Sequence, residues 1–297
     1  MPSAVLIVNA SSGAHLNGNT SPDIVRKQLE NAGIEVEILK GSIGEQIKAS
    51  LRSPAEYVIV DGGDGTINAT IAAHSGGDRP IGIIPGGTMN FLAQDYGIPV
   101  DREAAIAVIA AGSTRAVDIG TLGDHIFLHT AATGFPVRMG VHREKRRGRF
   151  KIIDKARLVI HALLTIHRDP RLTLTDDGGS DQREALTSAT FAFVVGTFTG
   201  HLLPRPHRDV ASGELTAFAI DPKSGIDLIR LFLRGAFGEM ADDPDVVRLV
   251  MREGTLTGKR RQVHAMLDGE SVRVRLPCRI GLRPGAVRIF APAAVTD

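Results

Sequence analysis

Three glycines and a carboxylate follow a short apolar run within residues 57–68, and their order suits one kind of chemistry. Backbone N–H groups at the start of a helix have no partner inside the helix and lie at its positive end. Gly62, Gly63 and Gly65 would let a polyphosphate approach such groups closely, with Asp64 facing the phosphates or their metal ion. The spacing matches neither the GxGxxG of dinucleotide folds nor the GxxxxGKS/T of P-loops. The structural alternative is an ordinary tight turn in which Asp64 caps the helix that follows.

A second segment, residues 80–93, repeats this design. An apolar run leads into Pro85, Gly86 and Gly87, and Thr88 and Asn90 follow where the next helix should begin. Because loops at the carboxyl ends of parallel strands gather at one edge of a sheet, the two segments are expected to bind one nucleotide together. Taken alone, the second segment is also a common turn between a strand and a helix.

These motifs resemble those of a known family. GGDGT at residues 62–66, followed by PxGTxN at 85–90, is similar to the catalytic domain shared by diacylglycerol, sphingosine and ceramide kinases and their bacterial relatives. Three further motifs have counterparts in that family: residues 9–13, the VDIG of 117–120 and the LDGE of 267–270. GGDGT also occurs in soluble NAD kinases, but the PxGTxN turn is not expected there. The resemblance covers nearly the whole chain.

The resemblance implies an ATP-dependent kinase that uses Mg²⁺. Phosphoryl transfer needs the terminal phosphate held in line with an acceptor, charge neutralisation, and a carboxylate that orients the acceptor hydroxyl. Asp64 is expected to contact Mg²⁺ through water, and Asp118 to join it unless it is satisfied at a strand junction. The expected nucleotide-binding residues come from both segments and from the first motif: Asn9, Gly62, Gly63, Asp64, Gly65, Thr66, Gly87, Thr88 and Asn90.

The late LDGE motif supplies the expected catalytic residues. By resemblance, Asp268 is the general base and Glu270 an assisting carboxylate. An Asp-Gly pair between two apolar runs is also a strong signal for a tight hairpin turn, which is the structural alternative.

The chain departs from the family pattern at three places. Ala10 replaces a proline, the turn at residues 13–18 lacks the basic residue that many relatives have, and Ser212 stands at a usually acidic position. The last difference argues against the structural Mg²⁺ site described for some bacterial members. The missing basic residue and the altered position of Ser212 leave open a nucleotide-binding regulatory protein without activity.

The order of elements predicts an α/β lobe followed by a β-rich lobe. Strands are expected near 4–8, 34–39, 57–60 and 81–84, with helices from 22, 42, 66, 88 and 101 between and after them. Such units give a parallel sheet with both faces covered. We therefore expect residues 1–120, with about 285–297, to form an α/β nucleotide lobe with a parallel sheet and glycine-rich phosphate loops.

Residues 121–284 are expected to form a mostly antiparallel β lobe that binds the lipid. Alternating runs joined by short turns predict strands near 171–175, 190–195, 215–220, 263–267 and 272–276. A further strand, near 287–290, is expected to return to the α/β lobe. Two helices, near 149–167 and 225–237, are expected to interrupt them. The first is apolar around most of its circumference, which favours buried core over the wall of an acyl-chain pocket.

Composition limits the class of partner. The formal net charge of +2 gives no sign of nucleic-acid binding, but six Lys or Arg lie within residues 143–151 and would suit an anionic lipid surface as well as a solvated loop. A single cysteine and no export signal favour a cytoplasmic protein, peripheral at the inner membrane surface. A homodimer remains open. A soluble NAD kinase and the regulatory protein are the competing functions.

Overall fold

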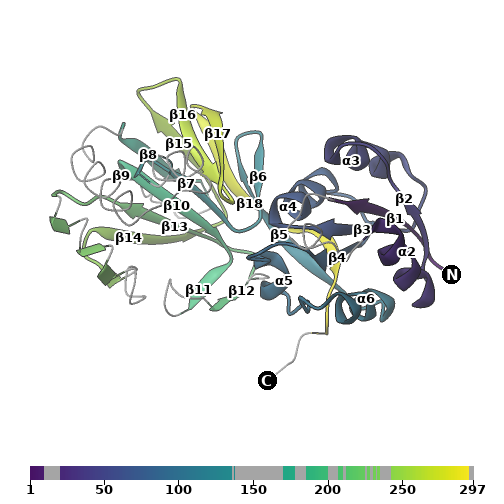
Figure 1. Cartoon of the computed structure of the whole chain (residues 1–297). Helices are drawn as coiled ribbons and strands as arrows, with labels where there is room; N and C mark the ends of the chain where they lie inside the picture. The colour runs from purple at the N-terminus through teal and green to yellow at the C-terminus, as the bar shows by residue number, and fades with distance from the viewer. Residues whose placement is uncertain are drawn as a thin grey trace, which may run out of the picture. The chain divides into compact units, whose positions relative to one another are not determined.

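The structure is a computed structural model, which describes residues 1–9, 21–135, 137, 170–177, 185–199, 207–209, 212–224, 226–227, 230–231, 233–234 and 242–293. It divides into two compact units (Figure 1): Met1–Val117 with Pro284–Asp297, here the α/β unit, and Asp118–Arg283, the β-rich unit. Strands β5 (Thr114–Leu122) and β18 (Cys278–Phe290) each run from one unit into the other.

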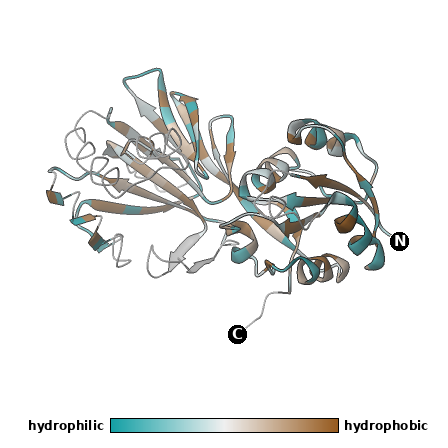
Figure 2. Cartoon of the chain, viewed as in Figure 1, coloured by the Kyte–Doolittle hydropathy of each residue, from teal (hydrophilic) through white to brown (hydrophobic). Residues whose placement is uncertain are grey.

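The α/β unit is built on a parallel sheet. Its strands are β1 (Ser3–Val8), β2 (Glu35–Ile38), β3 (Tyr57–Gly62) and β4 (Ile81–Pro85), in the order β2-β1-β3-β4-β18. The pairings of β1 with β2 and β3, of β3 with β4, and of β4 with β18 are all parallel. Because both faces of such a sheet are covered, its central strands are mostly apolar, as the brown colour along β1, β3 and β4 in Figure 2 shows.

Five helices belong to this unit: α2 (Pro22–Asn31), α3 (Ile43–Arg52), α4 (Asp64–Ala73), α5 (Phe91–Asp95) and α6 (Arg102–Ala110). Helices α2 and α6 contact each other, and α3 contacts α4 (Figure 1). Val25, Leu29 and Ile109 share one core cluster with Leu6 and Ile59 of the sheet, so α2 and α6 cover the same face.

Local sequence signals account for where these helices begin and end. The helix expected from residue 42 starts with a capping box, in which the Glu45 carboxylate accepts from the backbone N–H of Ser42 at 2.8 Å. Gly33 after α2 has a φ of 85°, which favours glycine. Helix α4 begins at Asp64, two residues earlier than expected, and Gly63 is its N-cap. No residue between Asp64 and the expected start interrupts the helical backbone.

The β-rich unit contains two antiparallel sheets. One has the order β14-β13-β10-β7-β16-β17, and the other joins β18, β15, β8 and β9, with β5 pairing β6. The strands are β6 (His125–Phe127), β7 (Thr130–Thr133), β8 (Leu172–Asp176), β9 (Ala185–Ser188), β10 (Thr190–Val195), β13 (Leu215–Ile220), β14 (Val246–Met251), β15 (Glu253–Gly258), β16 (Gln262–Leu267) and β17 (Glu270–Arg275). The short strands β11 (Thr197–Thr199) and β12 (His207–Asp209) pair separately.

One hydrophobic core lies between these sheets. Phe191 and Phe193 of β10 share a cluster with Phe127, Leu174 and Ile280 of the other sheet. The predicted antiparallel lobe is therefore confirmed, although β14 and β15 were not among the predicted strands. Residues 226–227, 230–231 and 233–234 are helical, in agreement with the helix predicted over 225–237, whereas the helix predicted over 149–167 lies outside the described residues.

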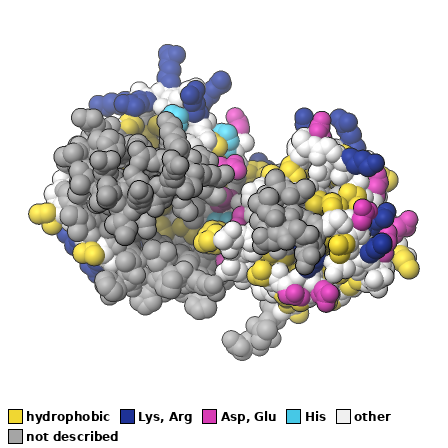
Figure 3. All heavy atoms as spheres, viewed as in Figure 1, with side chains coloured by type: hydrophobic (Ala, Val, Ile, Leu, Met, Phe, Trp, Pro, Cys, Tyr) yellow, Lys and Arg dark blue, Asp and Glu magenta, His cyan; other side chains and the backbone are white. Residues whose placement is uncertain are grey.

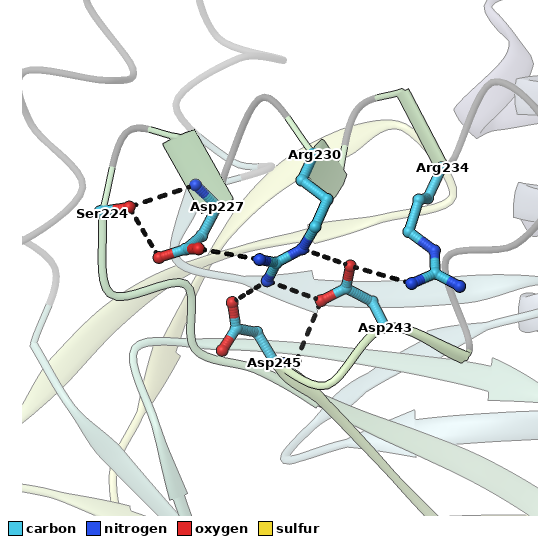
Figure 4. A network of polar contacts seen from close by, with 6 residues as sticks. All are labelled: Ser224, Asp227, Arg230, Arg234, Asp243 and Asp245. Atoms are coloured by element: carbon cyan, nitrogen blue, oxygen red, sulfur yellow. Dashed lines mark hydrogen bonds and ion pairs between the residues drawn. The ribbon is translucent and has the colours of Figure 1, made fainter.

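Charged side chains fix the connection between β13 and β14 (Figure 4). Arg230 donates to Asp227 at 3.0 Å, to both oxygens of Asp243 at 2.8 and 3.1 Å, and to Asp245. Arg234 lies 3.8 Å from Asp243, whose side chain has no exposed area. Burial raises the pKa of Asp243, but the hydrogen bonds from Arg230 and from the Asp245 N–H, together with the charges of Arg230 and Arg234, bring this pKa below its usual range. We call these residues the Arg230 network.

Among the described residues, none forms a helix that is long and apolar enough to cross a bilayer.

Candidate functional site

The two predicted glycine-rich segments do converge. We call residues 62–65 and 86–90 the paired loops. Gly62 is paired with Pro85 at the ends of β3 and β4, and the N–H of Gly86 donates to the Gly62 carbonyl at 2.8 Å. A Cβ on Gly87 would lie 2.9 Å from Gly63 Cα. Only glycine at position 87 permits this approach without a shift, so the paired loops form one continuous edge of the α/β unit.

Asp64 joins the paired loops. Its Oδ2 accepts from the backbone N–H of Asn90 at 2.9 Å, and its Oδ1 accepts from that of Phe91 at 2.8 Å. One carboxylate thus connects the first residue of α4 to the start of α5. Each oxygen accepts one N–H, and an ionised carboxylate offers about four lone-pair sites in all, so the expected contact with hydrated Mg²⁺ is compatible with this role.

Asn90 closes the second of the paired loops on itself. Its Oδ1 accepts from the Gly87 N–H at 2.9 Å and its Nδ2 donates to the Gly87 carbonyl at 3.0 Å. Asn90 is buried and has a φ of 49°, a conformation that asparagine tolerates better than most residues. The amide therefore shapes the loop.

This geometry corrects one expectation about the donors. The N–H groups of Gly86 and Gly87 were expected to face phosphates, but they donate to Gly62 and Asn90 inside the turn. The first N–H groups of α4, at Asp64 and Gly65, have no acceptor within a helix. Gly65 and Thr88 are exposed, so both remain candidates to contact a nucleotide.

The first predicted motif contacts the two residues that flank the first of the paired loops. Asn9 Nδ2 donates to Thr66 Oγ1 at 2.8 Å, and the Asn9 N–H donates to the Asp61 carbonyl at 3.0 Å. Thr66 is buried, so its hydroxyl contributes to the support of α4. The residues that follow Asn9 in this motif lie outside the described part of the chain.

Sequence reasoning missed Gln46, which holds the end of β1. Its Oε1 accepts from the Val8 N–H at 2.9 Å, and its Nε2 donates to the carbonyls of Val8 at 3.2 Å and Gly41 at 2.9 Å. Gln46 is buried although most of the residues around it in α3 are exposed. A lone amide on the apolar side of an amphipathic helix is the signal that would have found it.

Asp118 lies at a strand junction, as the structural alternative for this residue predicts. It is buried on β5, and its Oδ2 accepts from the Gly213 N–H at 3.0 Å. Gly213 directly follows Ser212, the residue at the usually acidic position. Among the described residues, no group of three or more His, Cys, Asp or Glu side chains could hold a metal ion. A metal at Asp118 therefore stays a prediction.

Asp268 lies in a two-residue turn between β16 and β17, with Leu267 paired to Glu270 across it. Asp268 and Gly269 have φ values of 48° and 92°, as a tight hairpin turn requires. The carboxylate also accepts from the N–H groups of Leu128, His129 and Thr130 at 2.7 to 2.9 Å. These donors fix its orientation. Glu270 is exposed at the start of β17.

Comparison with known proteins identifies the family. Residues 3–122 match the model of the Diacylglycerol kinase catalytic domain. Over this part of its length the chain matches the diacylglycerol kinase catalytic domain family. This match includes β1 to β5 and both paired loops, and the predicted recognition is confirmed.

Relatives of the family extend the similarity. A diacylglycerol kinase of Mycobacterium tuberculosis is 28% identical over 281 residues, covering 89% of this chain and 87% of its own. A diacylglycerol kinase of Staphylococcus saprophyticus is 36% identical over 137 residues, covering 44% and 45%. The crystal structure of a diacylglycerol kinase from Bacillus anthracis covers 99% of this chain and 98% of its own with a TM-score of 0.68 at 18% identity, which confirms the fold class.

Proposed function

We propose that this protein is an ATP-dependent lipid kinase that phosphorylates a hydroxyl group of a diacylglycerol-like or sphingoid lipid. The similarity to the M. tuberculosis diacylglycerol kinase over 89% of the chain carries this proposal. The convergence of the paired loops supports it, since their glycines and the first N–H groups of α4 suit a polyphosphate.

The α/β unit is proposed to bind ATP. Phosphates lie against the N–H groups of Asp64 and Gly65, and exposed Thr88 offers its hydroxyl. Asn9, Thr66 and Asn90 hold the paired loops in shape through the hydrogen bonds described above. Gly62, Gly63 and Gly87 leave room where a side chain would fill the edge.

Mg²⁺ fits the chemistry of this edge, with Asp64 as the residue that would hold it through water. When bound, the ion would neutralise charge on the phosphates. A hydrated ion needs few protein ligands, so the absence of a three-residue cluster among the described residues does not argue against it. Asp118 stays a second proposed metal contact.

Asp268 is proposed as the general base, and Glu270 as its assisting carboxylate. In the reaction the acceptor hydroxyl oxygen forms a bond to the terminal phosphorus, and the bond from that phosphorus to the bridging oxygen breaks as ADP leaves. Asp268 orients the hydroxyl and takes its proton. The three N–H donors of residues 128–130 hold the carboxylate ready for this role.

An assay with defined acceptors tests the proposal. The protein is incubated with Mg²⁺, labelled ATP and mixed micelles of diacylglycerol, monoacylglycerol, ceramide or sphingosine, with NAD as the soluble acceptor. We expect label in at least one lipid and none in NAD. Label in NAD alone would identify a soluble NAD kinase, and ATP binding without any label would identify a regulatory protein.

The protein is further proposed to act in the cytoplasm as a peripheral protein of the inner membrane surface, with transient contact. Flotation of the purified chain with vesicles checks this contact, and light scattering checks the homodimer. Recovery only in the unbound fraction at low salt would contradict a peripheral role.

A further inference from the structure

The outward face of the β16–β17 hairpin carries a concentration of positive charge. Along both strands, buried and outward residues alternate, with Val263, Ala265 and Val274 in the core. Six exposed residues of the hairpin and of the turn before it are basic or histidine: Lys259, Arg260, Arg261, His264, Arg273 and Arg275. We call them the basic strip. Figure 3 shows dark blue Lys and Arg side chains, with His in cyan nearby, projecting from the β-rich unit.

Strand register brings these residues together. His264 is paired with Arg273, and Gln262 with Arg275, so their side chains lie on one face about 5 Å apart at Cβ. The turn at Lys259–Arg261 is attached to the same end, because the Leu276 N–H donates to the Arg261 carbonyl at 2.9 Å. The strip is therefore one surface.

The strip is not neutralised by ion pairs. No ion pair of its Lys and Arg residues is found in the described part of the chain, where Arg171 and Arg230 do form such pairs. The nearest carboxylates by chain position are Asp268 and Glu270, at the far end of the hairpin, and Glu253, at the start of β15. His125, the neighbour of Asp124, contacts the Arg273 carbonyl at 3.2 Å. Five cations thus face solvent on a chain whose formal net charge is +2.

We infer that the basic strip docks the β-rich unit onto an anionic lipid bilayer. This inference rests on the proposed function as a lipid kinase. A Lys or Arg near an anionic membrane contributes about 1 kcal/mol, so a group of five is enough for reversible attachment. The strip contains no Phe, Tyr or Trp on which a base could stack, which disfavours single-stranded nucleic acid.

The hairpin also relates the strip to the proposed catalytic carboxylate. The Asp268–Gly269 turn closes one end of the hairpin, and the strip occupies the other, a strand length of about 20 Å away. A hairpin that lies flat on the bilayer would therefore keep the Asp268 end at the lipid surface while the cations hold the headgroups. The strip would raise activity on bilayers and leave activity on neutral micelles unchanged.

Two matched variants test the inference. The strip variant carries Lys259→Gln, Arg260→Gln and Arg261→Gln, and the control variant carries Lys27→Gln, Lys40→Gln and Lys48→Gln in the α/β unit. All six side chains are exposed, so both proteins should fold, which thermal melts check. Each variant loses the same charge. Binding is measured by sedimentation with vesicles of phosphatidylcholine, with or without about one third phosphatidylglycerol.

We expect the strip variant to bind the anionic vesicles about 100-fold more weakly than the native protein at low ionic strength, and the control variant to bind within a few-fold of it. High salt should remove the difference. Phosphorylation of lipid in vesicles should fall with binding, whereas phosphorylation in neutral micelles should not change.

Equal vesicle binding by the strip variant and the native protein would overturn the inference, as would a loss confined to binding of RNA or DNA. If the proposed lipid kinase function is wrong, the result will differ from both of these. The native protein will then label no lipid in micelles, whatever the vesicle binding shows. Binding that depends on the strip, together with micelle activity in both variants, supports both proposals.

Discussion

The paired loops and the Arg230 network both contain buried or half-buried carboxylates, but they hold them in different ways. Asp64 accepts two backbone N–H groups, whereas Asp243 is paired with the guanidinium of Arg230. Backbone donors are neutral, so the charge of Asp64 remains available to a cation. In the network, all three carboxylates are paired with the guanidinium of Arg230, and Asp243 also lies near Arg234.

Asp268 follows the pattern of Asp64, since three backbone N–H groups donate to its carboxylate. The comparison therefore separates carboxylates that can do chemistry from those that hold the fold together. It predicts that variants of the first kind lose function and variants of the second kind lose stability.

The largest effect is expected from Asp268→Asn. Loss of a general base should lower the rate of lipid phosphorylation by about 10² to 10⁴. Steady-state kinetics in mixed micelles measures the rate. Asp124→Asn is a matched control, since Asp124 lies in the other two-residue turn of the β-rich unit, and it should keep full activity. A rate unchanged by Asp268→Asn would leave the carboxylate only a role in the turn.

Gly87→Ala should come next. A Cβ there lies 2.9 Å from both Gly63 Cα and Asn90 Oδ1, so the paired loops must separate. We expect about 100-fold weaker ATP binding, at the upper end of the usual cost of overpacking. Isothermal titration gives the Kd. Gly44→Ala places its Cβ where nothing lies within 4 Å and serves as the control, with unchanged affinity expected.

Asp243→Ala should test the other side of the comparison. Removing one partner of a buried pair leaves Arg230 short of its main acceptor, and we expect a loss of about 3 kcal/mol in the free energy of unfolding. Urea titration measures it. Asp221→Ala breaks the exposed pair with Arg171 and should cost less than about 1 kcal/mol. A folded Asp243→Ala protein with normal stability but lost activity would reverse the assignment.

His74 shows a third arrangement, a neutral ring that is buried beside a cation. Its Nε2 lies 2.9 Å from Ser50 Oγ, and burial, with a smaller contribution from Arg79, lowers the pKa of His74 to about 4. The unfolded chain takes up this proton near pH 6.5, before the folded protein does, so stability should fall as the pH drops from 6.5 towards 4.

The expected loss over this range is about 2 kcal/mol. Denaturant titrations at several pH values should show a flatter dependence in His74→Gln, whereas His264→Gln, at an exposed position, should keep the native slope. If both variants keep the native dependence of stability on pH, a residue other than His74 causes the acid sensitivity.

Much of this fold follows from local signals in the sequence. Strands β10 and β13 were predicted at their observed limits, since alternation and bounding turn residues mark both ends. Strand β15 was missed because Gly254 and Gly258 resemble loop residues. Gly254 is needed there because a Cβ would lie 2.6 Å from the Thr175 carbonyl of β8, a contact that depends on distant residues.

Some features of the candidate site could likewise be predicted from the sequence, and others could not. That the glycine-rich segments lie side by side could be predicted, because parallel strands bring their carboxyl ends together. The partners of Asp64 and Asp268 could not, since they are backbone N–H groups and any residue other than proline supplies one. The hydrogen bond from the Gly87 N–H to Asn90 could not be predicted either, because no spacing rule specifies the left-handed conformation of Asn90.

The last strand of the chain completes the first sheet, and this sets an order for folding in the cell. Ile289 of β18 pairs with Ile81 of β4, although almost the whole β-rich unit separates them in the sequence. While the ribosome is still making that unit, one edge of β4 lacks its final neighbour and is open to wrong pairing. A ribosome that stalls before residue 284 would therefore release a chain whose nucleotide sheet is unfinished, and such a chain would need a chaperone.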